Sequence, residues 1–551
     1  MIGNDRLDII WKGARLMTSV IETDVLIIGA GPAGLMAANM LQKQGVDFIC
    51  LEKRAEPSQL SKALGIQARS LELFELLGVH KPFLKQGYPG PGAKLHLGGE
   101  NPSLVELYHI ESRYPYMLIV PQSDTERILE EHLESLGGKV KREEEMLEVR
   151  ETEDGVYVRT GKEEYQARYL LACDGAHSPV REAFDVPFEG QDEGYTFFLG
   201  DVEIPELNEV FINMHINDRG ALGIFPYKDG SYRVVGLDRS KQNEPHKDKP
   251  TFEEMQESVR TILEDPFTIA DPKWLSNFGT SHRQVPNYRK GPVFFIGDAA
   301  HVHNPMGGQG MNLGLQDAMN IAWKLSVVLK GIAGDPFLDS YHEERWPLGK
   351  DVLKETSRML KVANLEGAQG KIRNWTGKAA LTQNWVQNRI ANHLSNIYNE
   401  YEDAERNKSL KDPSLSRKAL QAGRRLPDHL LFFDGTTDER LYPLIERHGH
   451  LCLIYTDAEN DDLTDYAFLL SKKIEEDYPD LIKVFLVAKG GTVALGQEKL
   501  PIIYDVHRHL NQNVGMKEGH TLLVRPDGHV AFHDTAADVS QTMRKLETFF
   551  Q

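Results

Sequence analysis

Residues 297–312 combine the residue types that bind a flat or negatively charged ligand. They read GDAAHVHNPMGGQGMN and contain one acid, one proline and four glycines. A strand-like apolar run precedes them, and a helical pattern follows, with apolar residues at Leu315, Ala318, Ile321, Ala322, Leu325 and Leu329. Glycines let backbone N–H groups approach a ligand closely, and the start of a helix favours negative charge. This loop is the first candidate binding site.

A second glycine-rich turn, GAGPAG at 29–34, stands near the start of the chain. It follows a strand of the buried parallel type and precedes a helical pattern, and a second apolar strand ends in Glu52. This context turns a weak GxGxxG match into a strong prediction of a dinucleotide-binding unit. Gly29 permits the tight turn, Gly31 admits a pyrophosphate, and Gly34 lets helix and strand pack closely. Glu52 would bind ribose hydroxyls, which favours FAD or NAD over NADP.

An acid–glycine pair, Asp174-Gly175, follows a third apolar strand at 169–173. Ser178 as the N-cap and Pro179 at the first helical position mark the start of a helix directly behind it. The pair therefore stands at the carboxyl end of a strand, where open α/β sheets bind ligands. An Asp-Gly turn without a ligand is the alternative interpretation.

Length and composition narrow the class of protein. A chain of 551 residues predicts two to four domains, and 40% hydrophobic with 26% charged residues is a normal globular mixture. The formal charge of −19, from 63 basic and 82 acidic residues, argues against nucleic acid and against an anionic membrane surface as partners. The three cysteines, Cys50, Cys173 and Cys452, are far apart, which excludes a disulfide scaffold and a CxxC site and favours a reducing cytoplasm.

Two N-terminal segments are not interpreted as membrane elements. Residues 1–19 lack the apolar core of a signal peptide and are expected to form a tail, within which Met17 is an alternative start. The longest uncharged stretch, 25–41, contains three glycines and one proline and is shorter than about 20 residues. We therefore interpret it as a strand, a turn and a helix.

The order of these patterns predicts a discontinuous cofactor domain. Short alternating strands run from 189 to 284 and predict an antiparallel sheet with one apolar, aromatic face, as expected of a cover over a substrate. Helices follow, and the chain ends in a separate α/β unit. We predict a tail (1–20), the first part of the cofactor domain (21–188), the substrate sheet (189–284), the second part with helices (285–402), a linker (403–420) and a C-terminal domain (421–551).

Three motifs in this order, GxGxxG at 29–34, DG at 174–175 and GD at 297–298, resemble the FAD-dependent aromatic hydroxylases. These are the class A flavoprotein monooxygenases related to para-hydroxybenzoate hydroxylase. The resemblance covers roughly the first 400 residues, and the tail resembles the thioredoxin-like domain of the phenol-hydroxylase and polyketide-hydroxylase branch. It implies an α/β fold: a Rossmann-like FAD-binding domain with an inserted antiparallel β-sheet substrate domain, a helical region and a thioredoxin-like α/β domain. Because this tail has no CxxC, we expect it to serve packing or dimer contacts.

By this resemblance, residues from all three motifs hold FAD. Asp298 would bind a hydroxyl of the flavin's linker, Arg69 and Gln122 its phosphate side, and Asp174 with Gly175 would line the path of FAD and NAD(P)H. Pro305 would lie near the isoalloxazine ring. The ring's pyrimidine edge would face backbone N–H groups of Gly307, Gly308, Gly310, Met311 and Asn312. A helix N-terminus stabilises the negative charge that reduced flavin carries there.

The chemistry implied by the resemblance belongs to the cofactor. NADPH or NADH reduces FAD, O2 adds to give a flavin C4a-hydroperoxide, and its terminal oxygen attacks an electron-rich aromatic carbon. No catalytic side chain is essential; the protein would hold the substrate, exclude water and help deprotonate a phenol. His215, Arg219 and Tyr227 are the candidates for substrate contacts, with an ordinary structural role as the alternative for each.

Three functions stay open on the sequence alone. The leading one is a cytoplasmic hydroxylase of small aromatic substrates, for which the relatives suggest a homodimer. The second is a monooxygenase that modifies or inactivates a bulky polyketide or antibiotic, and the third is a flavin-binding sensor without turnover. A metal at His301 and His303 is not expected, because no carboxylate or cysteine completes a ligand set. Flavin halogenases are disfavoured by the lack of a WxWxIP sequence.

Overall fold

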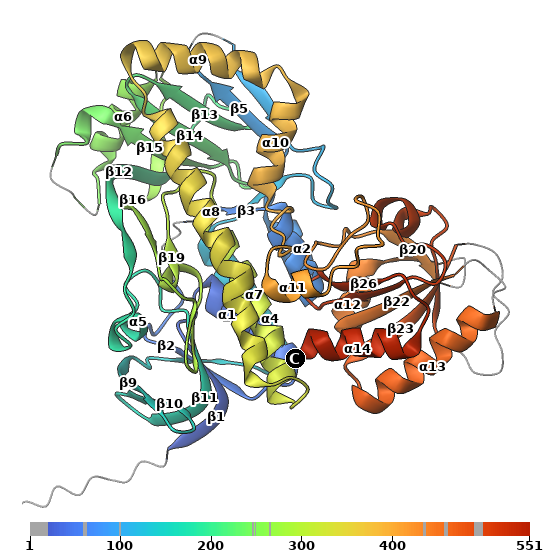
Figure 1. The fold of residues 1–551 in the computed structure, drawn as a ribbon. Helices are drawn as coiled ribbons and strands as arrows, with labels where there is room; N and C mark the ends of the chain where they lie inside the picture. The colour runs from blue at the N-terminus through green and yellow to red at the C-terminus, as the bar shows by residue number, and fades with distance from the viewer. Residues whose placement is uncertain are drawn as a thin grey trace, which may run out of the picture.

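The computed structural model describes residues 20–58, 63–98, 101–244, 247, 249–263, 266–433, 437–456, 461–489 and 500–551. All but the last residue of the predicted tail lies outside them. Figure 1 shows a parallel sheet at one end of the molecule, an antiparallel sheet at the other, and a C-terminal domain beside the long helices that join them. This arrangement confirms the predicted fold class.

The parallel sheet is the Rossmann-like sheet that the first motif predicts. Its strands are β1 (Ile21–Ile28), β2 (Phe48–Glu52), β8 (Val140–Arg142), β11 (Glu164–Ala172) and β18 (Val293–Phe295), in the order β18-β11-β1-β2-β8, with β17 (Arg289–Lys290) antiparallel at the edge. The hairpin of β9 (Met146–Thr152) and β10 (Gly155–Thr160) extends from β11. Residues 25–28 of β1 are buried, as expected of a strand covered on both faces.

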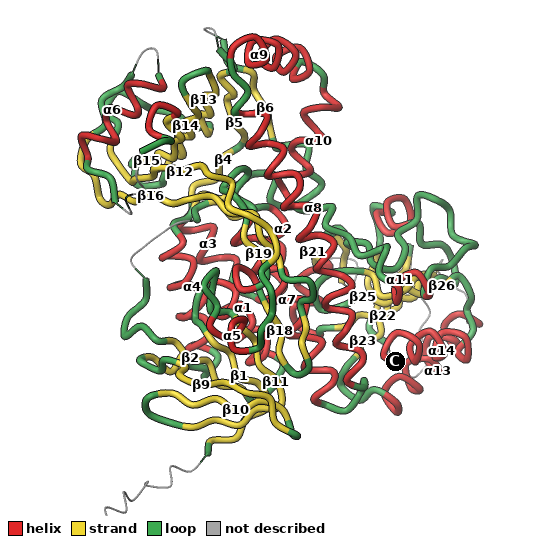
Figure 2. Tube along the Cα trace, turned by 60° about the vertical axis from the view of Figure 1, so that its left-hand side comes forward, coloured by secondary structure: helices red, strands yellow, loops and turns green. Residues whose placement is uncertain are grey.

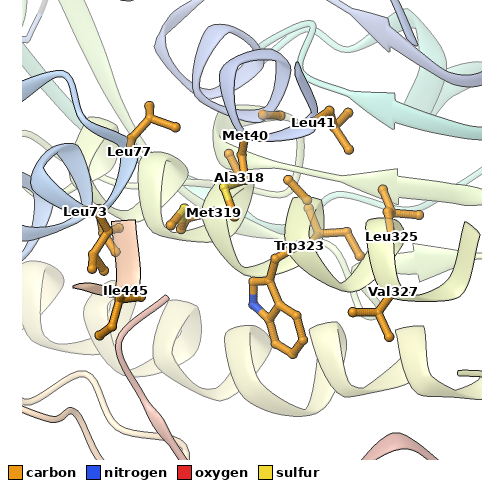
Figure 3. Packing of buried hydrophobic residues seen from close by; sticks show 14 of the residues in the cluster. Met40, Leu41, Leu73, Leu77, Ala318, Met319, Trp323, Leu325, Val327 and Ile445 are labelled. Atoms are coloured by element: carbon orange, nitrogen blue, oxygen red, sulfur yellow. The ribbon is translucent and has the colours of Figure 1, made fainter. Parts of the chain in front are cut away.

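Helices cover this sheet and pack on one another. They are α1 (Pro32–Lys43), α2 (Ala68–Leu77), α3 (His80–Gln86), α4 (Gln122–Ser135), α5 (Pro179–Ala183) and α7 (Gly310–Leu329). Figure 3 shows Ala318, Met319 and Trp323 of α7 between side chains of α1, α2 and a C-terminal helix. Helix α4 begins directly after Pro121, which is its N-cap.

The predicted antiparallel sheet forms, and strands from outside 189–284 extend it. Its order is β19-β16-β12-β15-β14-β13-β5-β6, with β5 and β13 parallel. The strands are β5 (Gly92–His96), β6 (Ser103–Glu106), β12 (Glu189–Glu203), β13 (Ile212–Asn217), β14 (Gly220–Pro226), β15 (Tyr232–Asp238), β16 (Ala270–Gln284) and β19 (His301–Val302). Helix α6 (Phe252–Ile262) covers one face. Because β19 belongs to the 297–312 loop, this substrate sheet is joined to that loop by backbone pairing.

The connecting elements are short strands and long helices. A small sheet consists of β3 (Gly65–Ile66), β7 (Met117–Ile119) and β4 (Tyr88–Gly90), with β7 in the middle. Helices α8 (Ser340–Ala363), α9 (Gly367–Leu381), α10 (Asn384–Ser395) and α11 (Glu405–Ser409) follow. The segment predicted as a linker is packed, because buried Asn407 donates to Tyr401 O and Asp412 pairs with Lys545. The division of the chain into these six segments stays a prediction.

The C-terminal domain is a mixed sheet with helices. Its strands are β20 (Leu430–Phe433), β21 (Thr437–Arg440), β22 (His450–Thr456), β23 (Ile482–Ala488), β24 (Ile502–Tyr504), β25 (Thr521–Val524) and β26 (Val530–Asp534), in the order β21-β20-β24-β23-β22-β25-β26. Its helices are α12 (Leu441–His448), α13 (Asp461–Asp477) and α14 (Val539–Phe550). Burial raises the pKa of its one cysteine, Cys452, to about 12, so that thiol is not reactive near neutral pH.

A buried ionic network joins this domain to the rest of the protein. Glu344 of α8 accepts two hydrogen bonds from Arg525, at 2.7 and 2.9 Å, and one from Lys324 of α7 at 2.7 Å. Arg525 also pairs with Asp527, and all four side chains are buried. The expectation of a packing role for this domain therefore has a structural basis. Within the described residues, no helix is long and apolar enough to cross a membrane.

Candidate functional site

The three motifs meet at one place, although 268 residues separate the first from the last. A Cβ placed on Gly29 would stand 2.4 Å from the carbonyl oxygen of Cys173, which precedes the acid–glycine pair. A Cβ on Gly314 of α7 would stand 3.1 Å from Cα of Gly297 and 3.5 Å from Cβ of Ala33. Glycine is therefore required where these backbones touch. The sequence motifs form one site at the carboxyl ends of β1, β11 and β18.

The first glycine turn has the geometry of a pyrophosphate site. Gly29 has φ of +101°, and a Cβ on Gly34 would stand only 2.0 Å from the carbonyl oxygen of Gly29. A Cβ on Gly31, in contrast, would meet no atom within 4 Å, so the turn is open on that side. Gly31 is also the N-cap of α1 and offers no side chain to the first N–H groups of the helix. An anion can accept those hydrogen bonds.

Glu52 stands at the end of β2 and is held in its ionised form. Its carboxylate accepts hydrogen bonds from Ala30 N at 3.0 Å and from Arg54 N at 3.0 Å and Nε at 2.9 Å. Burial raises the pKa of Glu52, but these hydrogen bonds outweigh burial and lower it below its ordinary value. Arg54 is a site residue that sequence reasoning missed. The sequence indicated it only as a basic residue two positions after Glu52, the expected ribose-binding acid.

Gln122 lies in the same neighbourhood at the start of α4. Its side chain accepts from Ala63 N at 3.2 Å and donates to Glu126 at 2.9 Å. Glu126 is buried, and burial raises its pKa, while the hydrogen bond from Gln122 and the charge of Arg54 oppose this rise. These polar side chains therefore lie close together. The contact of Gln122 with the phosphate side of the cofactor stays a prediction.

Asp174 stands at the end of β11, and helix α5 provides a hydrogen-bond donor to only one of its two carboxylate oxygens. Its Oδ2 accepts from Val180 N at 3.0 Å, whereas its buried Oδ1 has no hydrogen-bond partner among the described residues. Burial raises the pKa of Asp174. Gly175 has φ of +87°, and a Cβ there would meet nothing within 4 Å. A polar ligand beside this pair would satisfy the remaining oxygen.

The 297–312 loop runs from β18 into α7 and leaves polar groups facing outward. Asp298 is exposed while its neighbours on both sides are buried. Gly307 and Gly308 have positive φ values of +80° and +61°, and the N-cap of α7, Gln309, makes no side-chain hydrogen bond to the helix. The first turn of α7 contains no acid. Such a helix start favours a negatively charged ligand, and its contact with the edge of a reduced flavin stays a prediction.

Asn312 has a structural role that was not predicted. Its side chain accepts from Gln67 N at 2.9 Å and donates to the carbonyl oxygens of Gly65 and Gly308 at 2.8 and 2.9 Å. It is fully buried. Asn312 therefore fixes the loop against β3 with its side chain, and only its backbone N–H is available for a cofactor.

Asp317 holds the loop from behind and was missed by sequence reasoning. It accepts from His301 Nε2 at 2.7 Å, Arg345 Nε at 2.7 Å and Gly297 N at 3.3 Å, and it is completely buried. Burial raises the pKa of Asp317, but the charges of Arg345 and His301 outweigh burial and lower it. The signal in the sequence was the single acidic residue of α7.

Asn304 connects the same loop to the substrate sheet. Its amide donates to Glu193 of β12 at 2.9 Å, and its oxygen accepts from Met306 N at 3.2 Å. Half-buried Pro305 lies between Asn304 and Met306 in the sequence. The position of the proline is thus set jointly by the loop and by the sheet.

Only one of the three substrate candidates lies between the substrate sheet and the cofactor domain. Tyr227 packs with Ile119 and Ile212 in a cluster that includes Met214. His215 pairs directly with Leu222, which contacts α6, so its side chain is on the opposite face. Arg219 is exposed in the turn between β13 and β14. These placements argue against substrate contacts for His215 and Arg219.

Arg69 is also not brought to the cofactor loops. Its guanidinium donates to Glu72 at 2.9 Å and to the backbone oxygen of Asp527 at 2.5 Å, and it lies near His529. The side chain is buried against the C-terminal domain. The expected contact with the flavin's phosphates is corrected accordingly: this arginine belongs to the domain interface.

The two histidines of the loop have protein partners. His301 binds Asp317, and His303 Nδ1 lies 2.7 Å from the carbonyl oxygen of Asn304. Among the described residues, no group of three or more His, Cys, Asp or Glu side chains is placed to hold a metal ion. The geometry instead fits an extended dinucleotide that carries a flat ring: a pyrophosphate at Gly31, a ribose near Glu52 and the ring at the 297–312 loop.

We expect Asp298→Ala to weaken FAD binding about 10- to 100-fold, because one hydrogen bond from the ligand to a carboxylate is worth about 1.5–3 kcal/mol. Apoprotein titrated with FAD, followed by flavin fluorescence, measures the dissociation constant. His215→Ala, on the far face of the substrate sheet, is the matched control and should leave that constant unchanged. Equal affinity of Asp298→Ala and wild type would contradict the assigned role.

Comparisons with known proteins agree with this geometry. A family model described as FAD binding domain matches residues 22–356. An uncharacterized aromatic compound monooxygenase of Bacillus subtilis is 32% identical over 536 residues, which cover 96% of this chain and 97% of that protein. A rifampicin monooxygenase of Streptomyces venezuelae is 31% identical over 87% of this chain and 97% of its own length. The solved structure of an anhydrotetracycline hydroxylase from Streptomyces rimosus superposes with a TM-score of 0.75, at 28% identity, and covers 96% of this chain and 99% of its own.

Proposed function

The chain belongs to the class A FAD-dependent aromatic hydroxylases, and from this premise we propose that it hydroxylates a large, apolar phenolic compound with NAD(P)H and O2. The chain is an FAD-dependent monooxygenase of this family.

FAD, when bound, supplies the redox chemistry with NAD(P)H and O2. The protein's part is to bind and orient. Gly31 with the start of α1 would bind the pyrophosphate, Glu52 a ribose, and Asp298 the flavin's linker. The start of α7 would stabilise negative charge on the ring, while Asp317 and Asn304 hold the loop in place.

The face of the substrate sheet that is turned toward the 297–312 loop supports this substrate class. Met214, Phe225 and Tyr227 form one apolar cluster on it, and Phe197, Phe278 and Met306 belong to a second. Met306 directly follows the proline of the loop. Aromatic and methionine side chains bind extended aromatic rings, and methionine adapts to irregular shapes. Burial raises the pKa of the Tyr227 phenol, which therefore stays protonated near neutral pH.

The second candidate, modification of a bulky polyketide or antibiotic, is favoured by the same extended apolar face. It is also favoured by the names of two similar proteins, the rifampicin monooxygenase and the anhydrotetracycline hydroxylase. A polyketide or antibiotic would be a bulky member of the proposed substrate class, and the chemistry is the same. A flavin sensor without turnover is the alternative of another class.

A panel of simple phenols, anhydrotetracycline and rifampicin tests the substrate class. We expect at least one compound with several fused rings to stimulate NAD(P)H oxidation by the holoprotein more than tenfold. Met214→Asp, which puts a charge on the apolar face, should raise KM for that compound. His215→Ala, the adjacent residue on the other face, should not. If no compound stimulates oxidation, the sensor alternative is supported instead.

A further inference from the structure

Helices α8, α9 and α10 present large apolar side chains to the outside at one end of the molecule. Trp375 is 74% exposed, Trp385 67% and Ile372 62%, and Val362 at the end of α8 is 51% exposed. We call these four residues the outer helix face. Figures 1 and 2 both show α9 as the outermost element at the end occupied by the substrate sheet. Exposed apolar groups that gather on adjacent elements mark a contact surface.

The outward orientation of α9 is fixed by its inner side. Arg373 is buried and donates to the backbone oxygens of Val362, Ala363 and Leu365, where it satisfies the end of α8. Gly370 allows close packing there, since a Cβ would stand 2.8 Å from Leu365 O. Surface helices normally bury their apolar stripe and expose their charges. Here α9 buries an arginine and exposes isoleucine and tryptophan.

The segment that carries the outer helix face is basic, whereas the whole chain is acidic. Residues 354–393 contain seven basic and two acidic residues, a net charge of 7 − 2 = +5, while the whole chain carries −19, so the rest carries −24. The exposed bases are Lys354, Arg358, Lys361, Lys371 and Arg389, and they outnumber the exposed acids beside α9, Glu366 and Asp218. At physiological ionic strength, charges beyond about 8 Å are largely screened. The local positive charge therefore decides what approaches this face, and it selects an anionic surface.

Two copies of the chain meeting through this face would bring the same positive charges together, which disfavours that occupant. A bilayer with anionic lipids matches both properties, because tryptophan partitions to the headgroup level while lysine and arginine reach the phosphates. We propose that the outer helix face binds the surface of an anionic phospholipid membrane. Trp375, Trp385 and Ile372 enter the headgroup region, and the surrounding bases contact lipid phosphates.

Sedimentation of the FAD-loaded protein with vesicles tests this proposal. We expect binding to vesicles of phosphatidylglycerol and phosphatidylcholine, a blue shift of tryptophan emission, and little binding to phosphatidylcholine alone. The double variant Trp375→Ser/Trp385→Ser should bind at least tenfold more weakly, and Lys371→Glu/Arg389→Glu should do the same. Leu469→Ser, at a 55% exposed leucine of α13 in the C-terminal domain, is the matched control and should bind like wild type.

Circular dichroism and FAD content establish that each variant is folded. The proposal is overturned if the wild type does not sediment with anionic vesicles, or if the two double variants sediment as well as wild type. Light scattering measures the oligomeric state of the wild type and of the variants in solution. A dimer in solution that Trp375→Ser/Trp385→Ser dissociates would assign this face to a second copy of the chain.

Discussion

Replacing Glu344 by glutamine is expected to lower the free energy of unfolding by about 3–5 kcal/mol, the loss found when one partner of a buried ion pair is removed. Glu344 is the centre of the network between α7, α8 and the C-terminal domain. Its carboxylate binds Arg525 and Lys324, and Asn320 donates to it at 2.7 Å. A neutral amide would leave Lys324 without its charge partner in a buried position. Urea denaturation followed by tryptophan fluorescence measures the change.

The neighbouring Glu343→Gln is the matched control, because that side chain is half-buried and outside the network. The effect should depend on pH. Burial raises the pKa of Glu344, but Arg525 and Lys324 outweigh burial and hold it well below the ordinary value. When folding lowers the pKa of a carboxyl group, that group stabilises the folded protein at pH values above its ordinary pKa. This contribution is lost as the pH falls toward the lowered pKa. The difference between wild type and Glu344→Gln should therefore shrink below pH 4.5. A constant difference would contradict this explanation.

Asp317→Ala is expected to impair both stability and FAD binding. Its carboxylate is the common acceptor for Gly297 N, His301 and Arg345, so its loss leaves a buried arginine unpaired and releases the loop that carries Asp298. We expect a loss of about 3–5 kcal/mol in the free energy of unfolding. The FAD dissociation constant should rise more than tenfold, although Asp317 is buried behind the loop and does not itself face the expected ligand.

Two measurements separate these effects. Titration of apoprotein with FAD gives the affinity, and denaturation of apoprotein gives the stability without cofactor. Asp351→Asn, at an exposed aspartate of α8, is the control. The positioning role predicts that the variant, where it is folded, binds FAD weakly. Normal FAD affinity in a folded Asp317→Ala protein would show that the loop does not depend on this residue.

The local backbone of the site could be predicted because short-range patterns determine it. The strands before Gly29, Asp174 and Gly297 are apolar runs that end at a turn, and each turn leads into a helix. The cap formed by Ser178 Oγ, which accepts from Arg181 N at 3.0 Å, follows the same local rule. These patterns also explain why the three motifs lie at the same edge of one parallel sheet.

Side-chain partners could not be predicted where they come from distant parts of the chain. Arg69 was assigned to a phosphate, yet its acceptor at Asp527 lies 458 residues away in a domain whose docking the sequence does not specify. The alternation in β13 shows that Met214 and His215 face opposite ways. It does not show which face meets the cofactor domain, and the position of α6 decides this.

The predicted substrate sheet lacked β5 and β6 for a related reason. Strands β5 and β6 precede it by nearly a hundred residues and join through a parallel pairing of β5 with β13. Such long-range pairs leave no local signal. The link between Asn304 and Glu193 likewise depends on the sheet being placed against the loop. The parts of the site that set the position of the substrate are therefore the parts that only the structure reveals.

Incorporation of labelled oxygen tests directly whether the protein hydroxylates an aromatic compound. The FAD-loaded protein is incubated with NAD(P)H and the aromatic compound that best stimulates its oxidation, under ¹⁸O2, and the product is analysed by mass spectrometry. We expect a product that carries one ¹⁸O atom from O2 on its aromatic ring system. Consumption of NAD(P)H that yields only hydrogen peroxide with every compound, or oxygen derived from water, would contradict it.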